Sequence, residues 1–248
     1  MNYSFLEKKA IELRNSIGLG DKDPIIVENI LPQLGVLAIF KPLSEGFCGM
    51  ALKSDENRFM LINSEHSIGK QHFTVCHELY HLFVQENFKS VVCNNVGAFN
   101  KKAGEEYNAD MFASLLLMPA AAINSLVPDK EFGTNKISLG TILRLEQYFS
   151  CSRSALLYRL SKLGFITYET YEPLRKNIMR SAIEYGYKTD LYKKGNENTS
   201  IGNYGELTRK LFDEGLISET HYISLLYDLG MKEEDLATIF EDTTKNED

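Results

Sequence analysis

The spacing of hydrophobic residues predicts two helices at the start of the chain. Between residues 3 and 17, apolar side chains recur every three or four positions, which is the pattern of a helix with one buried face. Residues 25–34 predict a second helix, with Asp23 and Pro24 as its cap and first turn. Gly35 follows its last position and is expected to end it.

Three apolar segments then predict a small sheet. Residues 36–40 form the first expected strand, and residues 46–52 and 58–63 form the next two. The stretch 53–57 between the last two is polar and rich in turn-forming residues. We therefore expect these two strands to form a hairpin.

Two long and mostly apolar helices are predicted in the middle of the chain, at residues 71–84 and 104–118. Both carry apolar side chains over most of their surface, so both should lie in the core. Pro119 ends the second one. Residues 88–102 between them are polar and lack helical spacing, which predicts a loop that either borders a cleft or lies on the surface.

Residues 137–149 and 155–163 have helical spacing and are joined by a short turn, so together they resemble a helix-turn-helix. Such a pair would read DNA only if Arg153, Arg159 and Lys162 faced outward together. Three basic residues are few for that purpose. We therefore favour packing or the docking of a protein partner over direct DNA binding.

The rest of the chain is predicted to be mostly helical, and its pattern indicates no function. Residues 188–203 are polar and are expected to form a mobile loop, and residues 241–248 lack core-forming side chains and are expected to be a tail. The expected helices are at 172–185, 204–214 and 218–229.

Composition narrows the class of protein. The chain has 248 residues and a net charge of −7, which argues against a broad nucleic-acid surface. No apolar stretch is long enough to cross a bilayer and the N-terminus lacks a signal-peptide pattern, so we expect a soluble, cytoplasmic protein with no membrane partner. The four cysteines lack the close spacing of metal-binding motifs and are expected to be free thiols: Cys48, Cys76, Cys93 and Cys151.

The first of the two central helices carries the sequence His77-Glu78-Leu79-Tyr80-His81. Residues four apart share one helix face, so His77 and His81 can present two imidazole nitrogens to one cation. Glu78 lies one position on, where it can take a proton from a metal-bound water, as in zinc peptidases. Two histidines and a glutamate buried without a metal would be costly, which favours a zinc site.

The second central helix offers a third zinc ligand. Glu106 and Asp110 are four residues apart, so Glu106 can bind the metal while Asp110 accepts a hydrogen bond from a ligand histidine. Glu105 is the competing ligand, but the residue at the same spacing is Ala109, which accepts no such bond. We favour Glu106 and expect Glu105 to be an acid that the helix dipole favours in the first turn.

Residues 73–81 (FTVCHELYH), followed by residues 106–119 (EYNADMFASLLLMP), resemble the ImmA/IrrE metallopeptidases. The resemblance implies an α+β fold with a zincin-like peptidase domain at residues 1–135, in which a small sheet packs on the active-site helices. The helix-turn-helix-like segment at 136–165 and a mostly helical region at 166–248 would follow. Tyr80 stands where the family more often has glycine, so it is expected to narrow the cleft or to supply a hydroxyl.

The resemblance also implies a role for each matching residue. By this resemblance, His77, His81 and Glu106 bind zinc. Glu78 is the catalytic base, and Asp110 accepts a hydrogen bond from a ligand histidine. A further donor is expected at the oxyanion or the substrate, and the sequence does not rank the candidates Tyr80, Tyr107 and His72.

The resemblance further implies an endopeptidase that cleaves a helix-turn-helix transcriptional repressor and so relieves repression of a prophage, a mobile element or stress genes. Zinc peptidases commonly hold their substrate as a strand added to a sheet edge, and residues 59–63 are either that edge or an ordinary strand. The alternative function is non-catalytic, with the protein sequestering a repressor or acting as a toxin-antitoxin partner. Glu78 favours the enzyme, since a pure binder has no need of it.

Overall fold

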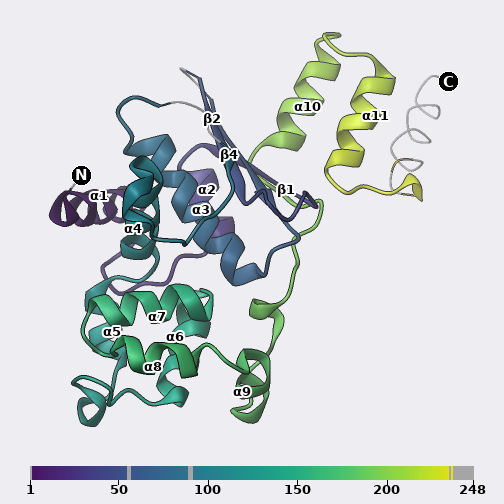
Figure 1. Cartoon of the computed structure of the whole chain (residues 1–248). Coiled ribbons are helices and arrows are strands. Elements are labelled where there is room, and N and C mark those ends of the chain that lie inside the picture. Colours follow the sequence, from purple (N-terminus) through teal and green to yellow (C-terminus); the bar gives the residue numbers. More distant parts are fainter. Residues whose placement is uncertain (1, 55–56, 89–91, 235, 237–248) are drawn as a thin grey trace.

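The computed structural model describes residues 2–54, 57–88, 92–234 and 236. In this part of the chain one five-stranded sheet lies beside a group of helices, which gives the mixed α+β fold expected of a zincin-like domain (Figure 1). The strand order is β4-β2-β3-β1-β5. The strands are β1 (Val36–Lys41), β2 (Gly49–Lys53), β3 (Arg58–Asn63), β4 (Val92–Cys93) and β5 (Ser200–Ile201).

The hairpin predicted from the apolar segments is confirmed. Strands β2 and β3 pair antiparallel, with Met50 opposite Leu61. On its other side β3 pairs in parallel with β1, where Ile39 lies opposite Leu61. Of the two alternatives for residues 59–63, the ordinary strand is confirmed and the substrate-binding edge is wrong, because both sides of β3 are already paired.

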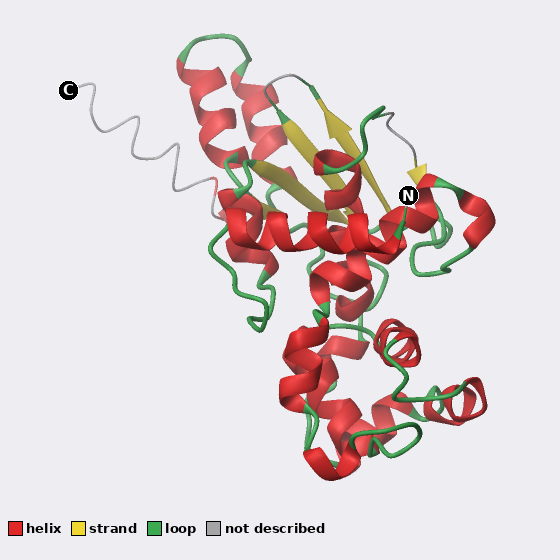
Figure 2. Ribbon diagram, turned by 90° about the vertical axis from the view of Figure 1, so that its left-hand side faces the viewer, coloured by secondary structure: helices red, strands yellow, loops and turns green. Residues whose placement is uncertain are grey.

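The two central helices are confirmed and form the middle of the molecule. Helix α3 (Ile68–Phe83) packs against β2 and β3 on one side and against α4 (Glu105–Leu117) on the other. Helix α1 (Tyr3–Ser16) packs against α4, as its apolar face requires. Figure 2 shows the helices and the strands in separate colours.

The second predicted helix begins later than expected. Helix α2 spans Val27–Gln33, and Ile26 is its N-cap without a side-chain hydrogen bond. Asp23 does not cap this helix, because its Oδ2 instead accepts a hydrogen bond of 2.8 Å from the Gly20 backbone nitrogen. The Asp23 carboxylate thus closes a turn before the helix.

The helical pair expected after residue 136 is present as α6 (Leu139–Phe149) and α7 (Arg153–Lys162), preceded by the short α5 (Ala120–Leu126). Arg153 and Arg159 are each 1% exposed. Because both arginines are buried, they do not face outward together with Lys162. The arrangement that these three residues would need to read DNA is therefore absent. One hydrophobic cluster joins α6 and α7 to α1, α3 and α4, and the division into three domains stays a prediction.

The single helix predicted at 172–185 is wrong. Two helices, α8 (Tyr168–Leu174) and α9 (Ile178–Glu184), are separated at Asn177, whose φ of 51° ends helical geometry. The expected loop at 188–203 contains β5, which pairs with Ala38 and Ile39 of β1.

The predicted helical hairpin is confirmed as α10 (Tyr204–Asp213) and α11 (Glu219–Asp228), which lie to the right of the sheet in Figure 1. They have a small hydrophobic cluster of their own. The tail expected at 241–248 lies outside the described residues. No single helix among the described residues has the length and apolar composition to cross a membrane, although α4 and α5 together pass that test with a bend of 43° between them.

Candidate metal centre

Helix α3 places His77 and His81 one turn apart on the face that meets α4, and they are only 1% and 5% exposed. His77 Nδ1 donates a hydrogen bond of 3.0 Å to Asp110 Oδ1. His81 Nδ1 donates one of 2.7 Å to Gln85 Oε1. These acceptors hold a proton on Nδ1 of each ring, so the two Nε2 atoms, 3.2 Å apart, point to one place.

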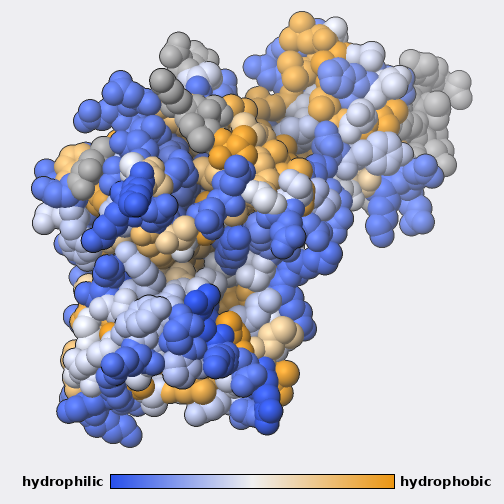
Figure 3. Space-filling model, viewed as in Figure 1, coloured by the Kyte–Doolittle hydropathy of each residue, from blue (hydrophilic) through white to orange (hydrophobic). Residues whose placement is uncertain are grey.

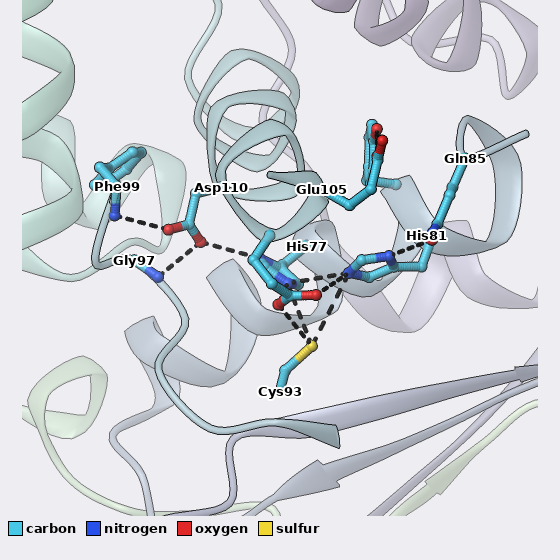
Figure 4. Close-up of polar contacts among 10 residues, drawn as sticks. His77, His81, Gln85, Cys93, Gly97, Phe99, Glu105 and Asp110 are labelled. Carbon is cyan, nitrogen blue, oxygen red and sulfur yellow. Dashed lines mark hydrogen bonds and ion pairs between the residues drawn. The ribbon is translucent and has the colours of Figure 1, made fainter. Parts of the chain in front are cut away.

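Helix α4 and strand β4 supply two further donors at the same place (Figure 4). Glu106 Oε2 lies 3.2 Å from His77 Nε2, and Glu106 Oε1 lies 3.5 Å from His81 Nε2. Cys93 Sγ lies 3.4 Å from His77 Nε2 and 3.9 Å from His81 Nε2, and it donates to Glu106 Oε2 at 3.2 Å. All four side chains therefore converge on one small volume.

This geometry fits a tetrahedral metal ion. Six distances join the four donor groups in pairs, and they run from 3.2 to 3.9 Å. For Glu106, Oε2 is used in the pairs with His77 and Cys93, and Oε1 in the pair with His81. Donor atoms about 2.0–2.3 Å from one tetrahedral zinc ion lie about 3.3–3.8 Å from one another. Two imidazoles, a carboxylate and a thiol are also the donor types that zinc prefers.

Asp110 ties this cluster to the loop that follows β4. Besides the bond from His77, its Oδ1 accepts from the Gly97 backbone nitrogen at 2.8 Å, and its Oδ2 accepts from the Phe99 backbone nitrogen at 2.8 Å. Asp110 is 3% exposed, so these bonds are shielded from water. The contact between Asp110 and a cluster histidine that the sequence suggested is present.

The electrostatics of the cluster favour a cation. Burial alone would lower the pKa of His77, but its hydrogen bonds to Asp110 and Glu106 outweigh burial and raise that pKa to about 10. Burial alone would raise the pKa of Glu106, but His77 outweighs it and lowers that pKa to about 2. Burial lowers the pKa of His81, and the neighbouring His77 lowers it further. Without a metal, His77 therefore carries a proton on Nε2 that it shares with Glu106, and a metal ion bound here would take the place of that proton.

Glu78 is the least satisfied group near the cluster. It is fully buried, and neither carboxylate oxygen has a hydrogen-bond partner among the described residues. Burial raises its pKa to about 7, against the opposing effects of His77 and the Cys93 thiol. A carboxylate held dry beside four metal donors is costly unless it serves a ligand or a water at that site.

Gly49 of β2 makes room for Glu78. A Cβ atom at this position would lie 2.7 Å from Thr74 Cγ2 and 3.0 Å from Glu78 Oε1. The strand and the helix therefore approach closely here, and only a glycine fits between them without a shift.

The three other candidate residues make contacts with partners outside the four donors, although the Tyr80 ring also lies beside that of His81. The Tyr80 hydroxyl donates to Glu105, and its ring packs 5.8 Å from that of Phe112. His72 is directed away from the cluster, because its Nδ1 donates to the Ser150 carbonyl at 2.9 Å. Tyr107 lies beside Tyr158, and the pKa of the Tyr158 hydroxyl is raised by burial and further by Tyr107.

Two members of the site were missed in the sequence. Gln85 follows His81 by four positions but lies beyond the end of α3, so helical spacing gave little signal for it. Cys93 is 16 residues from His77 and belongs to no spaced motif. None of the four cysteines forms a disulfide, as predicted, and Cys76 is fully buried in the core, which raises the pKa of its thiol to about 12.

Comparison with protein families gives a match for the central part of the chain. The model of a peptidase family described as the IrrE N-terminal-like domain matches residues 32–161, which is more than half of the 248 residues. The chain belongs to this family. No curated protein matches the chain. The match spans β1 to β4, α3 and α4, so it includes every residue of the candidate metal centre and supports a zincin-like, peptidase-type function.

Proposed function

We propose that the protein is a zinc-dependent endopeptidase that cleaves a helix-turn-helix transcriptional repressor. The observation that carries the peptidase proposal is the convergence of His77, His81 and Glu106 beside a buried Glu78 that has no hydrogen-bond partner among the described residues. A protein that only bound a repressor would gain nothing from a buried, unpaired carboxylate. The same observation argues against the non-catalytic alternative.

Each residue has a defined task in this proposal. His77, His81 and Glu106 would hold the zinc, while Asp110 and Gln85 keep the two imidazoles in the orientation that frees Nε2. Zinc in such a site acts as a Lewis acid and lowers the pKa of a water molecule toward neutrality. Glu78 accepts the proton of that water and passes it to the leaving amine of the cleaved peptide bond.

The substrate class rests on family resemblance. Family members act on repressors that silence prophages, mobile elements or stress genes, and a cut between the DNA-binding and dimerising parts of such a repressor would release its target genes. Direct DNA binding by this chain is not part of the proposal, since two of the three arginine and lysine residues considered for it are buried.

The test compares the new protein N-termini found by mass spectrometry in cells that express the protein and in cells that express Glu78→Gln. The comparison is made in the wild-type background and in a Cys93→Ala background, which removes the thiol from the cluster. Glu86→Gln, at an exposed residue just after α3, is the matched control.

We expect a new N-terminus inside a helix-turn-helix repressor that depends on Glu78 and is kept in Glu86→Gln. Zinc content should be equal in Glu78→Gln and its parent, because Glu78 is not a ligand. Cleavage that persists in Glu78→Gln would overturn the assignment of the base. The absence of any Glu78-dependent cut in such a repressor in both backgrounds would overturn the substrate class.

A further inference from the structure

Strand β4 covers the sheet edge that lies beside the candidate metal centre. It pairs antiparallel with β2, with Cys93 opposite Gly49 and Val92 opposite Met50. The Cys48 backbone nitrogen also donates to the Cys93 carbonyl at 2.8 Å. Gly49 is the residue that touches Glu78, so β4 lies where an extended peptide would pair with β2 in front of the catalytic groups.

The side chain of Cys93 points from this strand into the cluster (Figure 4). Its Sγ lies 3.2 Å from a Glu106 oxygen and 3.4 Å from His77 Nε2, which are distances expected between two ligands of one zinc ion. Cys93 is 2% exposed, so its thiol is shielded from solvent inside the cluster. The cluster therefore holds four protein donors, one more than the three of an ordinary catalytic zinc site.

We propose that Cys93 is the fourth zinc ligand in the resting protein and that β4 acts as an internal inhibitory strand. This inference rests on the proposed zinc peptidase function. With four protein ligands in a tetrahedral site, the position that a catalytic site keeps for water is taken by sulfur. The same strand occupies the β2 edge, so water and substrate are excluded together.

The anchoring of β4 allows it to leave without dismantling the site. Downstream, the backbone nitrogens of Gly97 and Phe99 are held by Asp110, and the Phe99 ring stacks on Tyr158 with centroids 3.4 Å apart. The backbone of Cys93 is held by the short pairing with β2, and its thiol is held by the cluster itself. A displacement hinged between Cys93 and Gly97 would free the fourth position while His77, bound to Asp110, stays in place.

The edge itself suits a peptide that replaces β4. Val92 on β4 and Leu52 on β2 are 46% and 42% exposed, although both are apolar. Figure 3 shows an apolar area over the part of the molecule where Figure 1 draws these strands. An extended, apolar segment of the substrate would pair with β2 in the place of residues 92–93.

Cobalt substitution tests the sulfur ligand directly and without an activity assay. The full-length protein is loaded with Co²⁺ and its absorption spectrum is recorded for the wild type, Cys93→Ser, Cys93→Ala and the control Cys48→Ala. Cys48 is a matched control because it is also buried and free and directly precedes Gly49, the first residue of β2. Circular dichroism of each variant shows whether it is folded.

We expect a near-ultraviolet sulfur-to-cobalt charge-transfer band in the wild type and in Cys48→Ala, and its loss in both Cys93 variants. Zinc affinity, measured by competition with a chelator, should fall at least about tenfold in Cys93→Ala, the lower end of the loss seen when a metal site loses a supporting group. Added zinc should also protect Cys93 from alkylation by iodoacetamide in the wild type. Glu78-dependent cleavage should be faster in Cys93→Ala than in the wild type.

The outcomes separate this inference from the proposed function. One outcome would overturn the inhibitory strand and leave the peptidase proposal standing. In that outcome the metal binds through His77 and Glu106, no sulfur band appears, and Cys93→Ala has the same zinc affinity as the wild type. A sulfur band that is lost only in the Cys93 variants supports the inference even if no substrate is cut. Failure of the folded wild type to bind Co²⁺ or zinc would overturn both.

Discussion

Asp110 shows how one residue can serve both the metal centre and the loop beside it. Its two oxygens accept hydrogen bonds from the His77 ring and from two backbone nitrogens, those of Gly97 and Phe99. All three partners are donors, so the site needs a group that only accepts, which is an ionised carboxylate. The orientation of His77, the proposed zinc ligand, and the placement of the segment after Cys93 therefore depend on the same side chain.

Replacement of Asp110 by asparagine should weaken zinc binding by about 10- to 100-fold. The amide would place an N–H donor opposite a backbone N–H donor and would remove the charge that orients His77. Chelator competition measures the change. Asp129→Asn, at an exposed position, is the control, and equal zinc affinity in Asp110→Asn and the wild type would show that this contact does not support the ligand.

Gly49→Ala should destabilise the fold by about 1–3 kcal/mol, because its Cβ would overlap Thr74 and press on Glu78. The free energy of unfolding is measured by chemical denaturation. Gly46→Ala is the matched control, since no atom lies within 4 Å of its Cβ position, and its effect should stay within about 0.5 kcal/mol. If the two variants were equally stable, the close approach of β2 and α3 at Glu78 would be refuted.

At the residue scale, the sequence predicted those site residues that a helix spaces regularly. His77 and His81, or Glu106 and Asp110, lie four positions apart, and helical geometry brings each pair to one face. Cys93 could not be predicted in this way. Its place depends on a two-residue strand whose pairing with β2 is set by tertiary structure and not by a local pattern.

At the scale of the elements, the long apolar segments were predicted and the short ones were not. Helices α3 and α4 carry enough periodic apolar positions to be recognised, and the β2–β3 hairpin has a clear turn. Strands β4 and β5 have two residues each, which is too few for any period to show. The parallel pairing of β1 with β3 was also hidden, because it joins segments that are not consecutive strands.

A buried ion pair joins α6 and α7 and should control the stability of this part of the fold. Arg153 binds Glu146, both are almost fully buried, and Arg153 also donates to the Leu174 carbonyl at 2.9 Å. The Tyr192 hydroxyl donates to Glu146 at 2.7 Å, so the pair links α6 and α7 to the chain before β5.

Arg153→Met should therefore destabilise the protein by about 3–5 kcal/mol, because it leaves Glu146 charged and buried without its partner. The double variant Glu146→Leu with Arg153→Met should recover much of that loss, since no charge remains unpaired. Chemical denaturation measures both. Arg180→Met, which removes an exposed pair with Glu184, should change stability by no more than about 0.5 kcal/mol. Equal effects of Arg153→Met and Arg180→Met would contradict this account.

At the scale of the whole molecule, His72 should make stability depend on pH. Burial lowers its pKa below the ordinary 6.5, and its Nδ1 donates to the Ser150 carbonyl between α6 and α7. At pH values between the lowered pKa and 6.5, His72 is protonated in the unfolded chain but neutral in the folded one. The stability that depends on neutral His72 is therefore complete above pH 6.5 and is lost as the pH falls.

The comparison of the wild type with His72→Asn isolates this effect. Asparagine keeps an N–H donor near the position of Nδ1 but does not titrate, and the other histidines are the same in both proteins. The wild type should lose stability relative to the variant as the pH falls below 6.5, by at most about 1.4 kcal/mol per pH unit. Parallel stability curves from about pH 5 to 8 would show that His72 is not held neutral by the fold.

The most direct test of the central claim is the zinc content of the purified protein by elemental analysis. The wild type, His77→Ala, Glu106→Ala and the control His221→Ala, at an exposed position on α11, are grown and purified alike. We expect about one zinc per chain in the wild type and in His221→Ala, and none in the other two, because a tetrahedral site that loses one ligand binds far more weakly. A folded wild type that holds no metal after zinc is added back, or zinc that remains in both His77→Ala and Glu106→Ala, would contradict the account.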